Sequence, residues 1–125
     1  MPADATYDQG NVFARILRGE LPNRTAYEDE HTLAFEDIHP QAPTHVLVIP
    51  KGPYVSLTDF AETATDAEIV SWVRAIGKVA RQAGVDQTGF RTIANNGEDG
   101  AQDVPHLHMH VLGGRRLGRM LAKPE

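Results

Sequence analysis

Three histidines on alternate positions constrain the fold of this 125-residue chain more than any other feature of its sequence. His106, His108 and His110 are separated by single apolar residues. Residues two apart in a β-strand project from the same face of a sheet. The pattern therefore predicts a strand over 106–112. It would carry a row of imidazoles on one face, about 6.5–7 Å apart, and apolar side chains pointing into a core on the other.

Four further segments have the composition of strands and are bounded by turn-forming residues. Together with the histidine segment, the expected strands are 25–28, 32–36, 45–49, 90–94 and 106–112. Two prolines exclude regular structure over 39–43, and the segment 51–59 is expected to be a loop.

Two helices are expected, one short and one long. Asn11 can cap the short helix, and Gly19 stops it. Thr65 and Glu68 form a capping-box pattern at the start of the long helix, and Gly84 ends it. The apolar stripe expected on the long helix consists of Ile69, Val73, Ile76, Ala80 and Ala83, with Trp72 and Val79 either widening it or contacting a partner chain.

The order of these elements is one helix, three strands, a long helix and two strands. Strands interrupted by one helix and joined by short connections predict an α+β fold: a five-stranded antiparallel sheet with one short and one long helix. The length of the chain is that of a single domain, 1–125. Its core is expected at about 11–114, and 115–125 is expected to form a C-terminal tail.

Composition argues against several classes of protein. The net charge of −5 argues against broad nucleic-acid binding. Three arginines cluster after the last glycine pair: Arg115, Arg116 and Arg119. They either form a solvated surface patch or attract an anionic substrate. The absence of cysteine excludes a disulfide framework and a cysteine-containing metal site. The first ten residues lack the features of a signal peptide, and no apolar run is long enough to span a membrane. A cytoplasmic protein without membrane contact is expected.

Three interpretations of the histidine row differ in their chemistry. The row can be a solvent-facing strand that happens to be rich in histidine. It can bind zinc, since imidazole is a common zinc ligand and Asp103 or His45 could complete the site. It can also hold a nucleophile, since a neutral imidazole attacks phosphorus and its neighbours can fix its tautomer.

Residues that can donate hydrogen bonds to an anion flank the row and favour the third interpretation. Gly97, Gly100 and Gln102 precede the row, and Gly113 and Gly114 follow it. Glycines let backbone N–H groups approach a ligand closely, such groups bind anions, and the Gln102 side chain adds a donor. The chain has no P-loop motif, so a nucleotide would not be held as in P-loop enzymes.

At this point the sequence resembles a known family. Residues 106–112 match the pattern His-φ-His-φ-His-φ-φ of the histidine-triad (HIT) superfamily, where φ is apolar. The segments that are similar to its Hint branch, the histidine-triad nucleotide-binding proteins, are 11–17, 33–38, 40–51 and 90–114. The resemblance covers roughly residues 11–121. It implies a homodimer in which two five-stranded sheets join into one ten-stranded sheet.

The resemblance also implies an activity, the hydrolysis of adenosine or guanosine 5′-phosphoramidates to an amine and the nucleoside monophosphate, with no metal or other cofactor. His108 would be the nucleophile that attacks the α-phosphorus, and water would then hydrolyse the nucleotidyl-histidine. His106 would fix and polarise His108, largely through its backbone carbonyl. His110 would hydrogen-bond a phosphate oxygen, and His45 would complete the histidine cluster.

Three groups of residues would bind the nucleotide by the same resemblance. The phosphate contacts would come from Asn95, Gly100, Ala101, Gln102, Asp103 and His110. Asp37 would accept hydrogen bonds from the ribose hydroxyls. The walls of the purine pocket would be Val12, Phe13, Ile16, Leu21, Phe35, Ile38 and Leu47.

Two residues depart from the family's pattern. Asp103 stands where many Hint proteins carry a small hydroxyl residue that can assist the leaving group, and Pro105 replaces a more usual aromatic residue. Two other functions stay open. Dinucleoside polyphosphate hydrolysis is disfavoured by Gly113-Gly114, which looks like Hint, and a nucleotide-binding adaptor with little catalysis is disfavoured by the intact triad.

Overall fold

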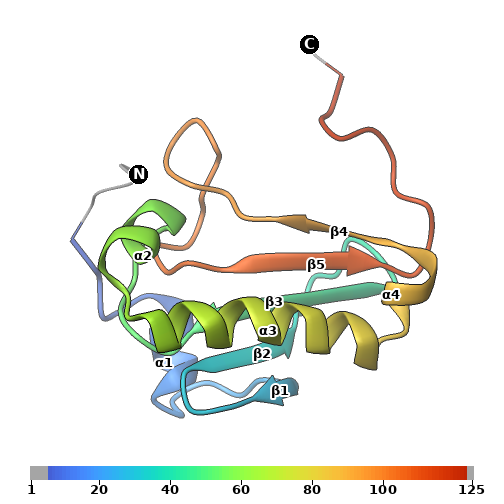
Figure 1. Ribbon diagram of the computed structural model, residues 1–125. Helices are drawn as coiled ribbons and strands as arrows, with labels where there is room; N and C mark the ends of the chain where they lie inside the picture. The colour runs from blue at the N-terminus through green and yellow to red at the C-terminus, as the bar shows by residue number, and fades with distance from the viewer. Residues whose placement is uncertain (1–5, 124–125) are drawn as a thin grey trace.

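Five strands form one antiparallel sheet in the order β1-β2-β3-β5-β4 in the computed structural model, which describes residues 6–123 (Figure 1). The strands are β1 (Thr25–Glu28), β2 (Thr32–Glu36), β3 (Thr44–Pro50), β4 (Phe90–Ile93) and β5 (Met109–Gly113). This confirms the predicted α+β class and sheet. The extreme ends of the expected domain, residues 1–5 and 124–125, lie outside the described residues.

The structure holds four helices in the described residues rather than the expected two: α1 (Val12–Leu17), α2 (Leu57–Thr63), α3 (Asp66–Gln82) and α4 (Val85–Thr88). The predicted loop over 51–59 is therefore wrong at its end. The Ser56 hydroxyl accepts a hydrogen bond from Asp59 N and starts α2. The short helix α4 follows Gly84, whose φ of +78° allows the chain to turn there.

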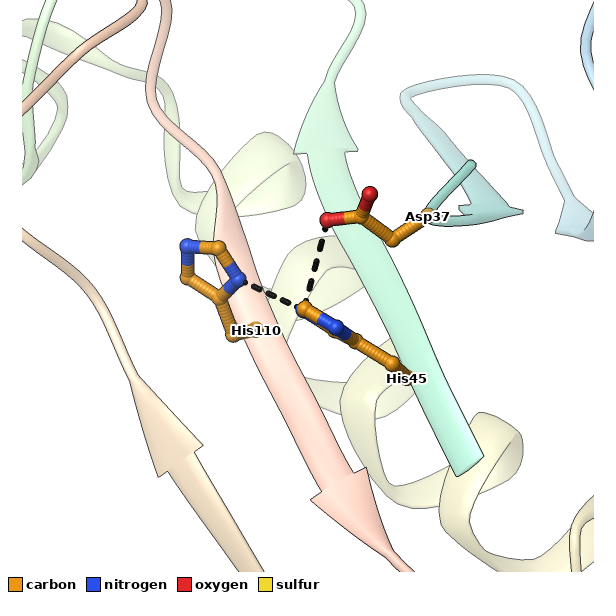
Figure 2. Close-up of side chains that lie close together, drawn as sticks. All are labelled: Asp37, His45 and His110. Atoms are coloured by element: carbon orange, nitrogen blue, oxygen red, sulfur yellow. Dashed lines mark hydrogen bonds and ion pairs between the residues drawn. The ribbon is translucent and has the colours of Figure 1, made fainter. Parts of the chain in front are cut away.

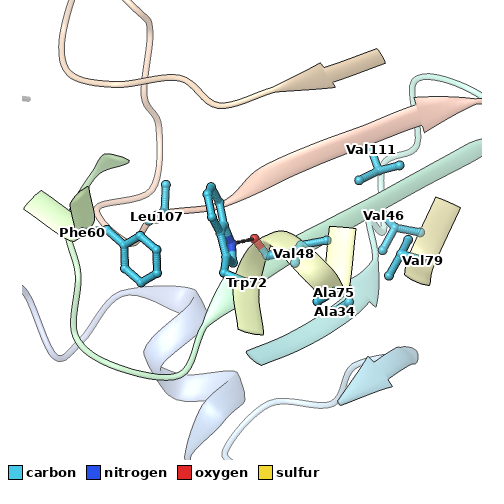
Figure 3. Close-up of a cluster of buried hydrophobic side chains, with 9 residues drawn as sticks. All are labelled: Ala34, Val46, Val48, Phe60, Trp72, Ala75, Val79, Leu107 and Val111. Carbon is cyan, nitrogen blue, oxygen red and sulfur yellow. Dashed lines mark hydrogen bonds between the residues drawn. The ribbon is translucent and has the colours of Figure 1, made fainter. Parts of the chain in front are cut away.

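Helix α3 covers one face of the sheet and buries the main core (Figure 1). Figure 3 shows Trp72 at its centre, where the indole Nε1 donates to Val48 O at 3.0 Å. Trp72 and Val79 are core residues, which decides between the two roles predicted for them. Val73 is 57% exposed, and Ala83 is exposed at the C-cap of α3, so the predicted places of both in the apolar stripe are wrong. The buried face of α3 is centred on Trp72, Ala75 and Val79 instead.

The opposite face of the sheet carries a second apolar cluster beside the histidines. This cluster consists of Phe13 of α1 with Leu33, Phe35, Leu47 and Ile49 of the sheet. In the β3–β5 pairing, Leu47 lies directly opposite His110. Residues directly opposite in an antiparallel pair share a face, so the histidines and this apolar cluster belong to one surface.

The histidine strand is shorter than predicted. Strand β5 begins at Met109, so His106 and His108 lie in the irregular segment that precedes it. Leu107 N donates to Tyr54 O at 2.9 Å, outside the ladder of the sheet. The alternation nevertheless persists, because Leu107 is in the core with α3 while the flanking histidines face the other way. Both of those histidines are buried, which excludes the interpretation of the row as a solvent-facing strand.

None of the helices described over residues 6–123 combines the length and the apolar character needed to cross a membrane. The cytoplasmic location expected from the sequence stays a prediction.

Candidate active site

An apolar cavity of about 410 Å³ opens beside the histidines. Its volume falls within the range of about 300–1,000 Å³ that is usual for small-molecule pockets. All seven residues predicted to wall a purine pocket line it: Val12, Phe13, Ile16, Leu21, Phe35, Ile38 and Leu47. The same cavity is lined by four polar side chains beside the apolar ones: Asp37, Asp103, His108 and His110. Ile38 is 82% exposed and can border the cavity only at its open edge.

His108 is held with one ring nitrogen free. Its Nδ1 lies 2.8 Å from the backbone oxygen of His106. A carbonyl oxygen only accepts hydrogen bonds, so Nδ1 carries the proton and Nε2 of the neutral ring carries a lone pair. Nε2 lies 3.5 Å from Asp103 Oδ1, and the edge-on ring of Phe13 packs 4.9 Å away, centroid to centroid. The ring therefore presents the lone pair of Nε2 at the cavity, which His108 lines.

His106 is fully buried beneath His108. Its Nε2 lies 2.8 Å from Pro50 O and must donate to it. Its Nδ1 then accepts the hydroxyl proton of Tyr7, whose oxygen is 2.6 Å away. Burial lowers the pKa of His106 to about 4; the bond to Pro50 opposes this shift, and the nearby charge of His108 adds to it. His106 is a neutral, fully hydrogen-bonded support for the His108 ring.

His45, His110 and Asp37 form a hydrogen-bonded chain at the side of the cavity (Figure 2). Gln41 N donates to His45 Nδ1 at 3.0 Å, so the proton of the neutral His45 ring is on Nε2. That Nε2 lies 2.9 Å from His110 Nδ1 and 3.4 Å from Asp37 Oδ2. His110 Nδ1 accepts the hydrogen bond from His45 Nε2, so the proton of the neutral His110 ring is on its Nε2, which can donate.

Burial keeps the His45 and His110 imidazoles neutral. It lowers the pKa of His110 to about 4, with further lowering by the neighbouring His108 and His45 charges, while Asp37 and Asp103 oppose the shift. Burial also lowers the pKa of His45 against the opposing charge of Asp37. At neutral pH, His110 therefore offers one N–H to a ligand without carrying a full charge.

The same three groups are the only cluster in the described residues whose ligand atoms approach metal-site spacing, all within 4.8 Å of one another. A metal needs a lone pair on each ligand nitrogen. Nε2 of His45 carries a proton here, because its other nitrogen accepts from Gln41 N. In this arrangement the backbone N–H of Gln41 and the ring of His110 occupy both nitrogens of His45, so the cluster does not match a metal-ligand set.

Asp37 follows β2 directly and is tied to the loop beyond it. Its Oδ1 accepts from His39 N at 2.8 Å, and its own N–H donates to His45 O at 3.0 Å. These bonds hold the carboxylate at the rim of the cavity, where Phe35 and Ile38 also contribute. The ribose contact predicted for Asp37 stays a prediction.

The residues predicted to bind phosphate fall into two groups. Asp103 and His110 line the cavity. Gln102 is buried and braces its own loop: its Oε1 accepts from Gly97 N, and its Nε2 donates to Val55 O and Val104 O. Its side-chain donors are therefore already used, and phosphate binding by this side chain would require breaking those bonds.

Backbone N–H groups of the loop before the histidines are also used in hydrogen bonds within the loop. Ala101 N donates to Glu98 O and Gln102 N donates to Gly97 O, while Ala101 adopts a φ of +59°. Gly100 approaches the backbone of Asn96 so closely that a Cβ would lie 2.8 Å from its oxygen. Asn95 is partly buried and follows β4. None of Asn95, Gly100 and Ala101 is among the residues that line the described cavity, and their phosphate contacts stay predictions.

Sequence reasoning missed several residues of the site. Tyr7 and the backbone groups of Gln41 and Pro50 fix the two supporting histidines. No local sequence motif predicts these contacts. Every residue except proline has the same backbone groups, so a backbone partner cannot be recognised from residue type, and Tyr7 is 99 residues from His106. Pro22 and Asn23, which were not among the predicted wall residues, also line the cavity.

Comparison with known proteins agrees with this geometry. A family model described as HIT domain matches residues 18–117. An uncharacterised 13.2 kDa HIT-like protein of Azospirillum brasilense is 61% identical over 118 residues, covering 94% of this chain and 97% of that protein. The purine nucleoside phosphoramidase of Escherichia coli K12 is 41% identical over 111 residues, covering 89% of this chain and 92% of that enzyme.

A solved structure is also similar over nearly the whole chain. The histidine triad protein of Clostridium difficile superimposes with a TM-score of 0.81 at 44% sequence identity, covering 93% of this chain and 100% of that one. The similarity therefore includes the sheet, the helices and the segment that carries the three histidines.

Proposed function

Because this chain belongs to the HIT domain family, we propose that it hydrolyses purine nucleoside 5′-phosphoramidates to the nucleoside monophosphate and an amine. The observation that carries the proposal is the placement of His108, which presents a free Nε2 to an apolar chamber of nucleoside size. The 41% identical phosphoramidase of E. coli supports the substrate class.

The proposed reaction has two displacements at phosphorus. His108 Nε2 attacks the α-phosphorus, the P–N bond to the amine breaks, and the amine takes up a proton from solvent water as it leaves. A water molecule then attacks the phosphorus of the nucleotidyl-histidine and gives up a proton to solvent, the P–Nε2 bond breaks, and the nucleoside monophosphate is released. Throughout, the His106 carbonyl accepts from Nδ1 and stabilises the positive charge that the ring acquires when Nε2 bonds to phosphorus.

The remaining polar groups act on the charge around phosphorus. The free N–H of His110 would donate to a phosphate oxygen, and His45 would hold it in the required tautomer. Asp103, 79% exposed by its side chain and 3.5 Å from the attacking nitrogen, would face the leaving group. A carboxylate there would accept a hydrogen bond from a protonated amine, which favours an amine over an anionic leaving group.

Replacing Asp37 with alanine should weaken nucleotide binding by about 1–3 kcal/mol, the range for losing hydrogen bonds to a charged group. The physical reason is the loss of a carboxylate acceptor for the ribose diol at the rim of the cavity. Titration calorimetry with AMP measures the change, and Asp37→Asn tests the charge alone while keeping an acceptor for His39 N. Unchanged AMP affinity in Asp37→Ala would show that Asp37 does not bind the ribose.

A fluorogenic adenosine phosphoramidate assay, run with and without a chelator, tests the proposed function. Turnover that chelator does not affect is expected. Loss of turnover in chelator would instead support metal chemistry. Diadenosine triphosphate hydrolysed more than about tenfold faster than the phosphoramidate would favour the dinucleotide hydrolase. AMP binding with no turnover of either compound would favour the adaptor.

We also propose that the chain forms a homodimer through β4. This strand is an outer edge of the sheet, and Phe90 on it is 41% exposed. An unpaired edge strand is a template for pairing with another chain, and antiparallel pairing of two copies would join the sheets. The Arg91 side chain of the same strand donates to the tail carbonyls of Gly118 and Arg119, which ties the C-terminal tail to β4 through this side chain. Light scattering of the protein in solution measures its mass and tests this proposal.

A further inference from the structure

Tyr7 makes a contact with the centre of the site that the proposed reaction does not use. Its hydroxyl oxygen lies 2.6 Å from His106 Nδ1, and the two rings meet edge to face at 5.5 Å between centroids. His106 is fully buried, so any partner of its Nδ1 must come from inside the protein. The N-terminal segment supplies that partner across 99 positions of sequence.

The proton count fixes the direction of this bond. His106 Nε2 faces Pro50 O and must donate, so Nδ1 of the neutral ring carries the lone pair. Tyr7 is then the donor. Burial raises the pKa of the Tyr7 hydroxyl, against the opposing hydrogen bond from Asn11, so the group keeps its proton at neutral pH. Both nitrogens of His106 are satisfied only while Tyr7 is in place.

The segment that carries Tyr7 is anchored to α1. Asn11 N and Asn11 Nδ2 both bond to Asp8 O, at 3.1 and 2.8 Å, and Arg18 donates to Gln9 O at 2.7 Å. Helix α1 also carries Phe13, whose ring packs against His108. The contact between Tyr7 and His106 therefore belongs to a braced unit rather than to a loose end.

The backbone of His106 carries the effect to the nucleophile. His108 Nδ1 donates to His106 O at 2.8 Å, and His106 itself is held on its two sides by Pro50 O and Tyr7. The main chain around the ring is tied as well, since His106 N donates to Val104 O at 2.8 Å and Leu107 N donates to Tyr54 O at 2.9 Å. The ring itself is held only by Pro50 O and Tyr7, so a ring anchored at one nitrogen could turn and strain the carbonyl that accepts from His108.

We propose that Tyr7 is a positioning residue for this site: its hydroxyl holds His106 in one tautomer and orientation, and thereby keeps the His106 carbonyl on Nδ1 of His108. Its connection to turnover rests on the proposed function, whereas its effect on the two rings does not. The Tyr7 hydroxyl reaches the nucleophile only through His106.

Tyr7→Phe tests the proposal, because it removes the hydroxyl and keeps the ring. Tyr27→Phe is the matched control: the Tyr27 hydroxyl also bonds to another side chain, Asp29 Oδ2 at 2.8 Å, but far from the histidines. In the proposal, Tyr7→Phe lowers kcat for the phosphoramidate about tenfold, the effect of losing one buried hydrogen bond, with KM unchanged within about twofold. Tyr27→Phe leaves both constants at the wild-type values.

Nitrogen-15 spectra of the histidine rings separate this role from general stability. In wild type, His106 is expected as the Nε2–H tautomer and His108 as the Nδ1–H tautomer. Tyr7→Phe should shift His106 Nδ1 and give His108 a mixture of both tautomers, while Tyr27→Phe gives the wild-type spectrum. Wild-type spectra for His106 and His108 in Tyr7→Phe would overturn the proposal, whatever its turnover. Changed spectra with unchanged turnover would overturn the connection to the reaction. If wild type hydrolyses no phosphoramidate, the proposed function fails, and the spectra alone decide the role of Tyr7.

Discussion

Replacing His108 with asparagine should lower phosphoramidate turnover by at least about a thousand-fold, because removal of a covalent nucleophile costs this much or more in other enzymes. The amide can still donate to the His106 carbonyl, but it has no nitrogen lone pair with which to attack phosphorus. Most of the residues that line the cavity come from α1, the segment 21–23, the segment 35–38 and Leu47, so AMP should still bind. Steady-state assays and calorimetry measure the two effects on the same preparation.

His31→Asn is the matched control, since His31 lies in the turn between β1 and β2 and its ring contacts only the exposed Glu30 among the described ion pairs. This variant should keep full turnover. A mass increase equal to one nucleotidyl group, trapped on wild type by acid quenching and absent from His108→Asn, would add direct evidence for the intermediate. Substantial turnover by His108→Asn would show that His108 is not the nucleophile.

Local patterns predicted the sheet almost completely. The expected strands at 25–28 and 32–36 have the bounds of β1 and β2, and that at 45–49 is within one residue of β3. Their signals are short-range: alternating or continuous apolar residues between turn-forming ones. The same signals placed the imidazoles and the apolar residues of 106–112 on opposite sides, even though β5 begins only at Met109.

The errors arise where tertiary contacts decide the structure. Val73 fits the apolar spacing of α3, but the helix rotates so that the larger Trp72 enters the core and its indole bonds to Val48 O. The side chain of Gln102 could donate hydrogen bonds to a phosphate. Its amide is instead bonded to three backbone groups nearby, those of Gly97, Val55 and Val104. Tyr7 has no local pattern at all. The residues that form the site could thus be predicted from their side-chain chemistry, but the groups to which they hydrogen-bond could not.

Acidification from pH 6.5 to pH 4 should strongly destabilise the fold. Burial lowers the pKa of His106 from its ordinary value of 6.5 to about 4. Between these values the unfolded chain binds a proton that the folded chain does not, so the free energy of unfolding falls as pH falls and levels off below about pH 4. For His106 alone, this loss is about 3 kcal/mol. The pKa values of His110 and His45 are lowered as well, so their contributions have the same sign.

Denaturant unfolding at fixed protein concentration, repeated at several pH values between 7.5 and 4, measures this loss. The part of this window above about pH 5 separates the histidines from the carboxylates. Burial raises the pKa values of Asp29 and Glu68, but hydrogen bonds from their neighbours outweigh it and lower both, so these groups begin to cost stability only below about pH 5, where the unfolded chain takes up their protons. His110→Asn should reduce the slope between pH 6.5 and 4. An unfolding free energy that stays constant over this window would mean that the histidines protonate as readily in the folded protein as in the unfolded chain. The buried, hydrogen-bonded site is incompatible with that result, because protonated His106 would add a second N–H where Tyr7 now donates.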